Sequence, residues 1–139
     1  MMTFDQIGQN LPALLISLFV CVLFVQSSLD KVFDWKGNLA WLTGHFEKTF
    51  LAPGVPVMLA MITVMEAVTG ALAGAGIIYY VMTGSLLPIF LAGFVGALSL
   101  IALFFGQRVA KDYPGAAVLV PYFLLQIVLI YLTNPHHAH

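Results

Sequence analysis

The spacing of charged residues along the sequence constrains the fold more than any other feature. Four stretches contain no Asp, Glu, Lys or Arg, namely residues 6–29, 49–65, 67–107 and 113–135. An α-helix needs about 20 apolar residues to cross ~30 Å of hydrocarbon, so each stretch can contribute a crossing. The third stretch is too long for one helix and must contain a turn. Gly84 and Ser85 mark that turn, because glycine can end a helix and serine can cap the next one.

The composition excludes a soluble fold. Charged residues make up 8% of the chain, against about 25% in an average soluble domain, and hydrophobic residues make up 61%. So few charges cannot cover a protein surface, and the remaining apolar surface must meet the lipid bilayer. The net charge of −1 gives no indication of nucleic-acid binding. We therefore predict an all-α integral membrane protein, a single domain over residues 1–139, with transmembrane helices over residues 11–32, 56–81, 86–105 and 114–132.

The segment between the first two predicted helices is the one long loop. Leu39, Leu42 and Phe46 recur there at near-helical spacing, and both tryptophans, Trp35 and Trp41, lie in this loop. Tryptophan prefers the headgroup layer of a bilayer. The pattern predicts a short interfacial helix over residues 38–51 that lies on the membrane surface.

The basic residues predict the orientation in the membrane. Three of them (Lys31, Lys36 and Lys48) belong to the first loop, and two (Arg108 and Lys111) belong to the third. With four helices, these two loops lie on the same side of the bilayer. The positive-inside rule then places both loops in the cytoplasm and both termini outside it.

Glu66 is the residue most indicative of function. It lies about ten residues into the second predicted helix, which is about 15 Å deep and close to the bilayer midplane. A carboxylate there costs at least about 2–3 kcal/mol, so it should face the bundle interior and be protonated or paired. As a functional group it would carry a proton or contact a ligand. As a structural group it would hydrogen-bond Gln26, Ser27 or Ser28 of the first helix and fix the helix packing.

A second set of candidate residues surrounds the two basic loops. It consists of Asp30 and Lys31 at the end of the first helix, and Gln107, Arg108, Lys111 and Asp112 around the third loop. Because both groups lie on one face of the membrane, they can meet. They would then form a polar mouth that binds a lipid headgroup, a quinone ring or a partner subunit. Alternatively, they are ordinary surface charges with a few ion pairs.

The remaining motifs give weaker indications of function. His136, His137 and His139 are of a type that binds metals, but no acid or thiol lies near them in sequence, and we predict no metal site. The small-residue pairs Gly70 with Gly74 and Ala92 with Gly96 predict close helix contacts, either within the chain or between two copies. The sequence contains no phosphate loop, hydrolase elbow or haem motif, so it indicates no catalytic residues.

Three segments of the chain resemble the DoxX-like family of small bacterial membrane proteins. They are FVQSSLDK at 24–31, VMEAVTG at 64–70 and GQRVAKDYPGAA at 106–117, with an aromatic-rich loop after the first. The family typically has a helix acid followed by a glycine, as in the second segment. The third is similar to the same region of relatives from Bacteroidetes-type bacteria. Family members often begin the first helix with an arginine, which this sequence lacks.

The resemblance implies a four-helix bundle in the bacterial inner membrane, with Lys31, Glu66 and Arg108 as functional positions. Relatives are described as the small membrane subunit of a thiosulfate:quinone oxidoreductase or as membrane partners in other redox complexes. By this analogy the chain is a non-catalytic accessory subunit beside other subunits, and its ligand is a quinone or a lipid. No cofactor is expected to be covalently bound, so another subunit or a quinone must carry electrons.

Two other functions are compatible with the sequence. The chain could be a structural or assembly protein that docks a partner through its charged face, with no chemistry of its own. It could also be a small proton-coupled transporter that uses Glu66. Four-helix multidrug exporters place one glutamate in the membrane and work as dimers, but their glutamate lies in the first helix of a shorter chain, whereas this one lies in the second.

Overall fold

The protein is a bundle of four long helices with shorter helices at its ends. The computed structural model describes residues 4–135, and this part of the chain contains helices and turns but no strand. The long helices are α2 (Leu11–Phe33), α4 (Val55–Thr83), α5 (Leu87–Val109) and α6 (Tyr113–Thr133), and each is long and apolar enough to cross a membrane. The short elements are α1 (Phe4–Gln9), α3 (Trp35–Phe46) and the single 3₁₀ turn η1 (Ala52–Gly54). The predicted all-α, four-helix membrane fold is confirmed.

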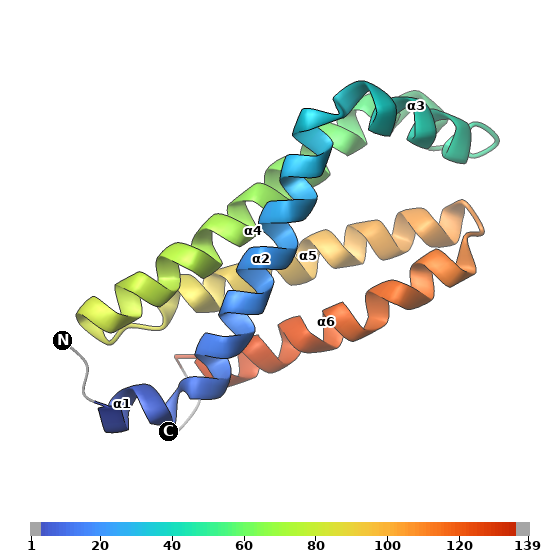
Figure 1. The fold of residues 1–139 in the computed structure, drawn as a ribbon. Coiled ribbons are helices and arrows are strands. Elements are labelled where there is room, and N and C mark those ends of the chain that lie inside the picture. Colours follow the sequence, from blue (N-terminus) through green and yellow to red (C-terminus); the bar gives the residue numbers. More distant parts are fainter. Residues whose placement is uncertain (1–3, 136–139) are drawn as a thin grey trace.

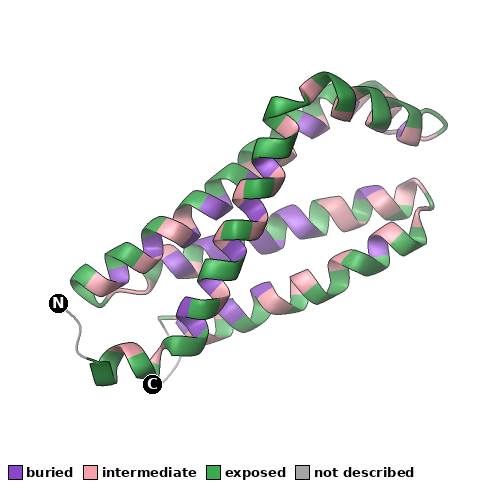
Figure 2. Ribbon diagram, viewed as in Figure 1, coloured by how far each residue is buried: buried purple, intermediate pink, exposed green. Residues whose placement is uncertain are grey.

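The long helices pack in the order in which they occur in the chain. Helix α2 packs along α4, α4 along α5 and α5 along α6, whereas α2 and α6 meet over a short stretch (Figure 1). Buried residues lie on the helix faces that are turned toward other helices, and most outward-facing residues are exposed (Figure 2). Many exposed side chains are large and apolar, such as Met61, Ile101 and Leu124. Because a helix satisfies its own backbone hydrogen bonds, such faces can meet lipid directly.

Small residues allow the helices to approach closely. A Cβ atom added at Gly70 would lie 2.9 Å from the backbone nitrogen of Val25 on α2, and one at Gly74 would lie 2.9 Å from Cys21 Sγ. On α5, a Cβ atom at Gly96 would lie 2.9 Å from the side-chain carbon Cδ of Gln126 on α6. These predicted glycine contacts therefore form between helices of one chain.

Some observed helix bounds differ from the expected ones. Helix α4 ends where Gly84 takes a left-handed conformation (φ 80°), as the sequence predicted, although α4 itself runs to Thr83 rather than residue 81. Helix α5 runs to Val109 rather than residue 105. Gly106, which follows Phe105, stays helical and is buried against the Phe46 ring.

The interfacial segment expected over residues 38–51 is displaced toward the amino terminus. Helix α3 begins at Trp35, directly after Asp34, whose backbone carbonyl accepts a hydrogen bond from the Asn38 side chain. It ends at Phe46, because residues 47–51 form turns in which Thr49 Oγ1 donates to the Phe46 carbonyl and accepts from Leu51 N. The expected segment is therefore helical over 38–46 and forms turns over 47–51.

The two basic loops share one end of the bundle. Helix α3 bends away from α2 at the end where the α5–α6 turn lies, while α1 and the α4–α5 turn lie at the other end (Figure 1). A hydrogen-bond contact of 2.9 Å between His45 Nε2 on α3 and Gln107 Oε1 on α5 joins the first and third loops. The first and third loops therefore meet through His45, and not through a direct bond from Asp30 or Lys31, which were the residues expected to meet the third loop.

Candidate functional site

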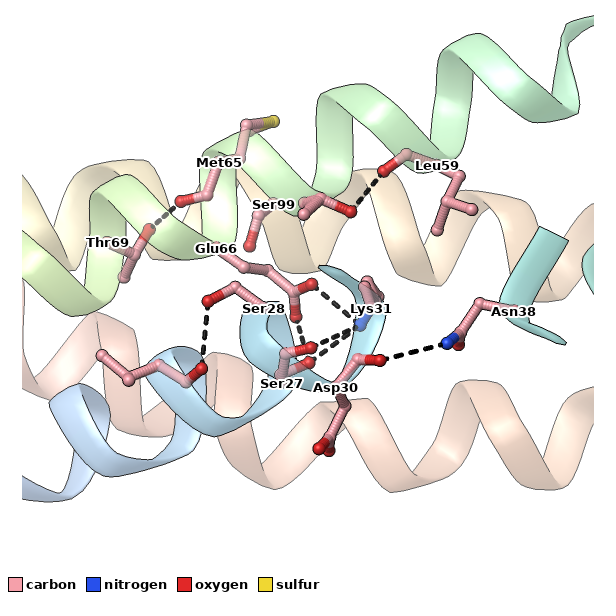
Figure 3. Close-up of polar contacts among 12 residues, drawn as sticks. Ser27, Ser28, Asp30, Lys31, Asn38, Leu59, Met65, Glu66, Thr69 and Ser99 are labelled. Carbon is pink, nitrogen blue, oxygen red and sulfur yellow. Dashed lines mark hydrogen bonds and ion pairs between the residues drawn. The ribbon is translucent and has the colours of Figure 1, made fainter. Parts of the chain in front are cut away.

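Glu66 lies inside the bundle and is held by α2. Its residue is 3% exposed, and Ser27 Oγ donates a hydrogen bond of 2.6 Å to its Oε2 atom. Lys31 Nζ lies 2.9 Å from its Oε1 atom and forms an ion pair with it (Figure 3). Lys31 Nζ also donates to Ser27 Oγ at 2.8 Å, so the three side chains form one closed cluster. The carboxylate is therefore paired, as its depth requires.

Local sequence explains how α2 reaches Glu66. Ser27 and Lys31 are four residues apart and lie on one face of α2, where such pairs are neighbours. Gly70 brings the α2 backbone against α4 one turn away from Glu66, so that a short serine side chain can reach the carboxylate. The long lysine stem carries its ammonium back into the bundle from the end of the helix.

The partners of Glu66 differ in part from those expected. Of the three polar residues proposed to hydrogen-bond it, Ser27 does so. Ser28 donates to the Val25 carbonyl of its own helix instead, and Gln26 is exposed. Sequence reasoning assigned Lys31 to the membrane surface and did not pair it with Glu66. The signal available was the i, i+4 spacing from Ser27.

A cavity of about 460 Å³ lies beside the Lys31–Glu66 pair. Helices α4 and α5 form its walls, and α3 covers it. Most of the lining is apolar, including Met58, Leu59, Met61, Ile62, Met65 and Leu103, with Trp41 and Phe46 from α3. Cavities of 300–1,000 Å³ with apolar walls and a few polar groups are typical of small-molecule sites.

Three polar side chains reach this cavity, and each is held by a neighbour. Lys31 is held by Glu66, and Asn38 donates to the Asp34 carbonyl at 2.8 Å. Gln107 contacts His45 as described above. Because these groups are already positioned, little conformational entropy would be lost when a ligand meets them.

His45 connects α3 to the α5–α6 turn and was missed by the sequence reasoning. Besides Gln107, its Nε2 atom lies 3.7 Å from Asp112 Oδ2, and its ring stacks on Trp41 with centroids 4.5 Å apart. Asp112 in turn caps α6 by accepting a hydrogen bond of 3.0 Å from Gly115 N. The signal was the position of His45 in a loop expected to share a membrane face with Gln107 and Asp112.

The predicted polar mouth is therefore divided rather than continuous. Lys31 and Gln107 reach the cavity, and Asp112 contacts His45 instead. Arg108 lies over the Tyr113 ring at 5.0 Å from its centroid, and Asp30 and Lys111 are exposed. His136, His137 and His139, the weak metal candidates, lie outside the described residues. Residues 4–135 contain no group of three side chains that could hold a metal ion.

The fold and the site define a class, a four-helix membrane protein with a largely buried lysine–glutamate pair beside an open, mostly apolar cavity. No model of a known protein family matches the sequence, and neither a curated protein nor a solved structure is significantly similar to it. The resemblance of residues 24–31, 64–70 and 106–117 to the DoxX-like family therefore stays a prediction.

Proposed function

We propose that this chain is a non-catalytic accessory subunit that holds a quinone for a redox complex of the bacterial inner membrane. The observation that carries this proposal is the cavity beside Lys31, whose walls are apolar and whose polar end is an ammonium group. A quinone has the matching form, since it combines carbonyl oxygens with an apolar ring and an isoprenoid tail.

The pairing of Lys31 favours a neutral ligand over an anion. Glu66 already balances the ammonium charge, so an anionic ligand would bring an uncompensated charge into an apolar cavity. A carbonyl oxygen adds no charge and can accept a charge-assisted hydrogen bond. The hydrogen bond from Lys31 Nζ to the Ser27 carbonyl is long, at 3.5 Å. The N–H group that makes it can therefore donate to a ligand instead.

The distribution of basic residues supports an orientation with the cavity near the cytoplasmic face. All five Lys and Arg residues lie at the α3 end of the bundle, either in the turns there or in the helical turns next to them. By the positive-inside rule this end is cytoplasmic and both termini are outside. The quinone would supply the redox chemistry, and other subunits would exchange electrons with it.

Binding of a radiolabelled short-chain quinone to the protein in nanodiscs tests the ligand. The unmodified chain should bind saturably, and Leu103→Trp, which fills the cavity, should weaken binding at least tenfold. Leu98→Trp is the matched control, because Leu98 lies on the same helix but faces outward. Both variants should show ordinary unfolding transitions. Equal binding by all three proteins would mean partition into lipid and would overturn the proposal.

Purification in mild detergent from the native membrane tests the complex. Mass spectrometry should find a haem, flavin or iron–sulfur protein at a fixed ratio to this chain. A chain that elutes alone or as a homodimer would overturn the accessory-subunit role, whether or not a quinone binds.

A further inference from the structure

A second cavity at the same end of the bundle has a different character. It measures about 420 Å³ and lies between the turn that follows α3 and the end of α5. Lys48 and Thr49 come from the first segment, and Lys111 comes from the second. Whereas the first cavity is mostly apolar, this one brings two lysines from distant parts of the chain to one hollow.

The two lysines are not neutralised by the protein. Neither ammonium forms an ion pair or a hydrogen bond with any residue in the range 4–135. The lining contains one carboxylate, that of Glu47, and His45 is turned to Gln107. With two ammonium groups and one carboxylate, the cavity keeps a net positive charge and favours an anion.

The backbone holds Lys111 in an uncommon conformation at this cavity. Its φ angle is 60°, in the left-handed region that favours glycine and that non-glycine residues rarely adopt. The turn is closed by hydrogen bonds from Lys111 N to the Arg108 carbonyl at 3.1 Å and from Asp112 N to the Gln107 carbonyl at 2.9 Å. A glycine here would relieve the backbone strain, yet the chain carries a lysine.

The position of this cavity next to α3 indicates the source of the anion. It adjoins α3, whose Trp35 and Trp41 are side chains typical of the headgroup layer. Phosphate groups of phospholipids lie in that layer, and lysines bind them by charge and hydrogen bonds. We propose that Lys48 and Lys111 bind a phosphate group, that of an anionic phospholipid in the leaflet at the α3 end.

Native mass spectrometry of the purified chain tests this site with phosphatidylglycerol, phosphatidylcholine and inorganic phosphate as separate probes. Phosphatidylglycerol should bind best, and Lys48→Gln and Lys111→Gly should each weaken its binding about fivefold. The glycine variant suits the left-handed backbone, so lost binding cannot be attributed to misfolding. Lys36→Gln, an exposed lysine of α3 outside the cavity, is the matched control.

The outcomes separate the two sources of phosphate. Displacement of phosphatidylglycerol by inorganic phosphate would support the phosphate site and show that the lipid tail is not needed. Failure of inorganic phosphate to compete would assign the site to the lipid. If Lys48→Gln and Lys111→Gly bound phosphatidylglycerol as Lys36→Gln does, the proposal would be overturned.

Discussion

The two ends of the bundle differ in the side chains that face inward. At the end with the α4–α5 turn, Gly76 brings α4 within 3.0 Å of the Ile89 backbone nitrogen, as measured from an added Cβ atom. Tyr80, which is 1% exposed, donates to the Gln6 carbonyl at 2.9 Å and accepts from Asn10 Nδ2 at 2.8 Å. Tight packing and a hydrogen-bonded tyrosine thus close this end and fasten α1 to it.

At the α3 end the same helices carry long or aromatic side chains instead. Met58 and Met65 of α4 and Phe46 of α3 border the cavity of about 460 Å³. A further hollow of about 410 Å³ lies between α5 and α6, near Phe104 and Phe123. The close glycine contacts thus lie at the solid end of the bundle, whereas long side chains border the cavity at the other end.

The Lys31–Glu66 pair holds the helices together beside the cavity, so breaking it should have the largest effect on stability. Lys31→Met leaves a buried carboxylate without its counter-ion, which should lower the free energy of unfolding by about 3–5 kcal/mol. The double variant Lys31→Met, Glu66→Leu should regain most of that loss, because no buried charge is left. Unfolding in mild detergent measures both. A single variant as stable as the parent would show that the pair contributes little.

Glycine contacts should be the next most sensitive feature. A Cβ atom at Gly70 would lie 2.6 Å from Val25 Cγ2 and 2.9 Å from the Val25 backbone, so Gly70→Ala must push α2 away from α4. We expect a loss of about 1–3 kcal/mol in the same unfolding measurement. Gly8→Ala is the control, since nothing lies within 4 Å of its added Cβ, and helix propensity predicts a small gain. If both variants changed the free energy of unfolding by the same amount, helix propensity, and not the contact with Val25, would explain the effect.

The hydrogen bonds of Tyr80 should have the smallest effect, confined to the closed end. Tyr80→Phe removes the hydroxyl that joins α4 to α1 and should cost about 1 kcal/mol. Amide hydrogen exchange in α1 should become faster, while exchange in α3 stays unchanged. Tyr79→Phe, on the exposed face of α4, should leave both unchanged. Faster exchange in α3 would show that the two ends are coupled.

The sequence predicts the helices far better than it predicts the site. Gaps between charges locate membrane helices because lipid imposes a length and a polarity on each one. Glu66 can be identified as a candidate for the same reason, because a carboxylate deep in a membrane helix is costly unless it faces the bundle interior. Local rules also find the Gly84 turn.

The cavities could not be predicted, because they depend on which side chains of separate helices face each other. The pairing of Lys31 with Glu66 joins two helices through a flexible lysine stem, whose direction follows from packing rather than from spacing. The role of His45 likewise depends on where α3 bends after Asp34. These are tertiary contacts. A single sequence shows which residues could form such contacts, but not which residues they pair with.

Lys31 belongs to the helix contact and to the cavity at once. A molecule that accepts a hydrogen bond from Lys31 therefore changes how firmly α2 is held to α4, and any change in that contact alters the molecule's affinity by the same free energy. The melting temperature of the bundle should therefore change with the fraction of cavities that hold the molecule, even if no helix moves. In a membrane complex, a neighbouring subunit that contacts α2 would then change the affinity for the ligand without contacting the ligand itself.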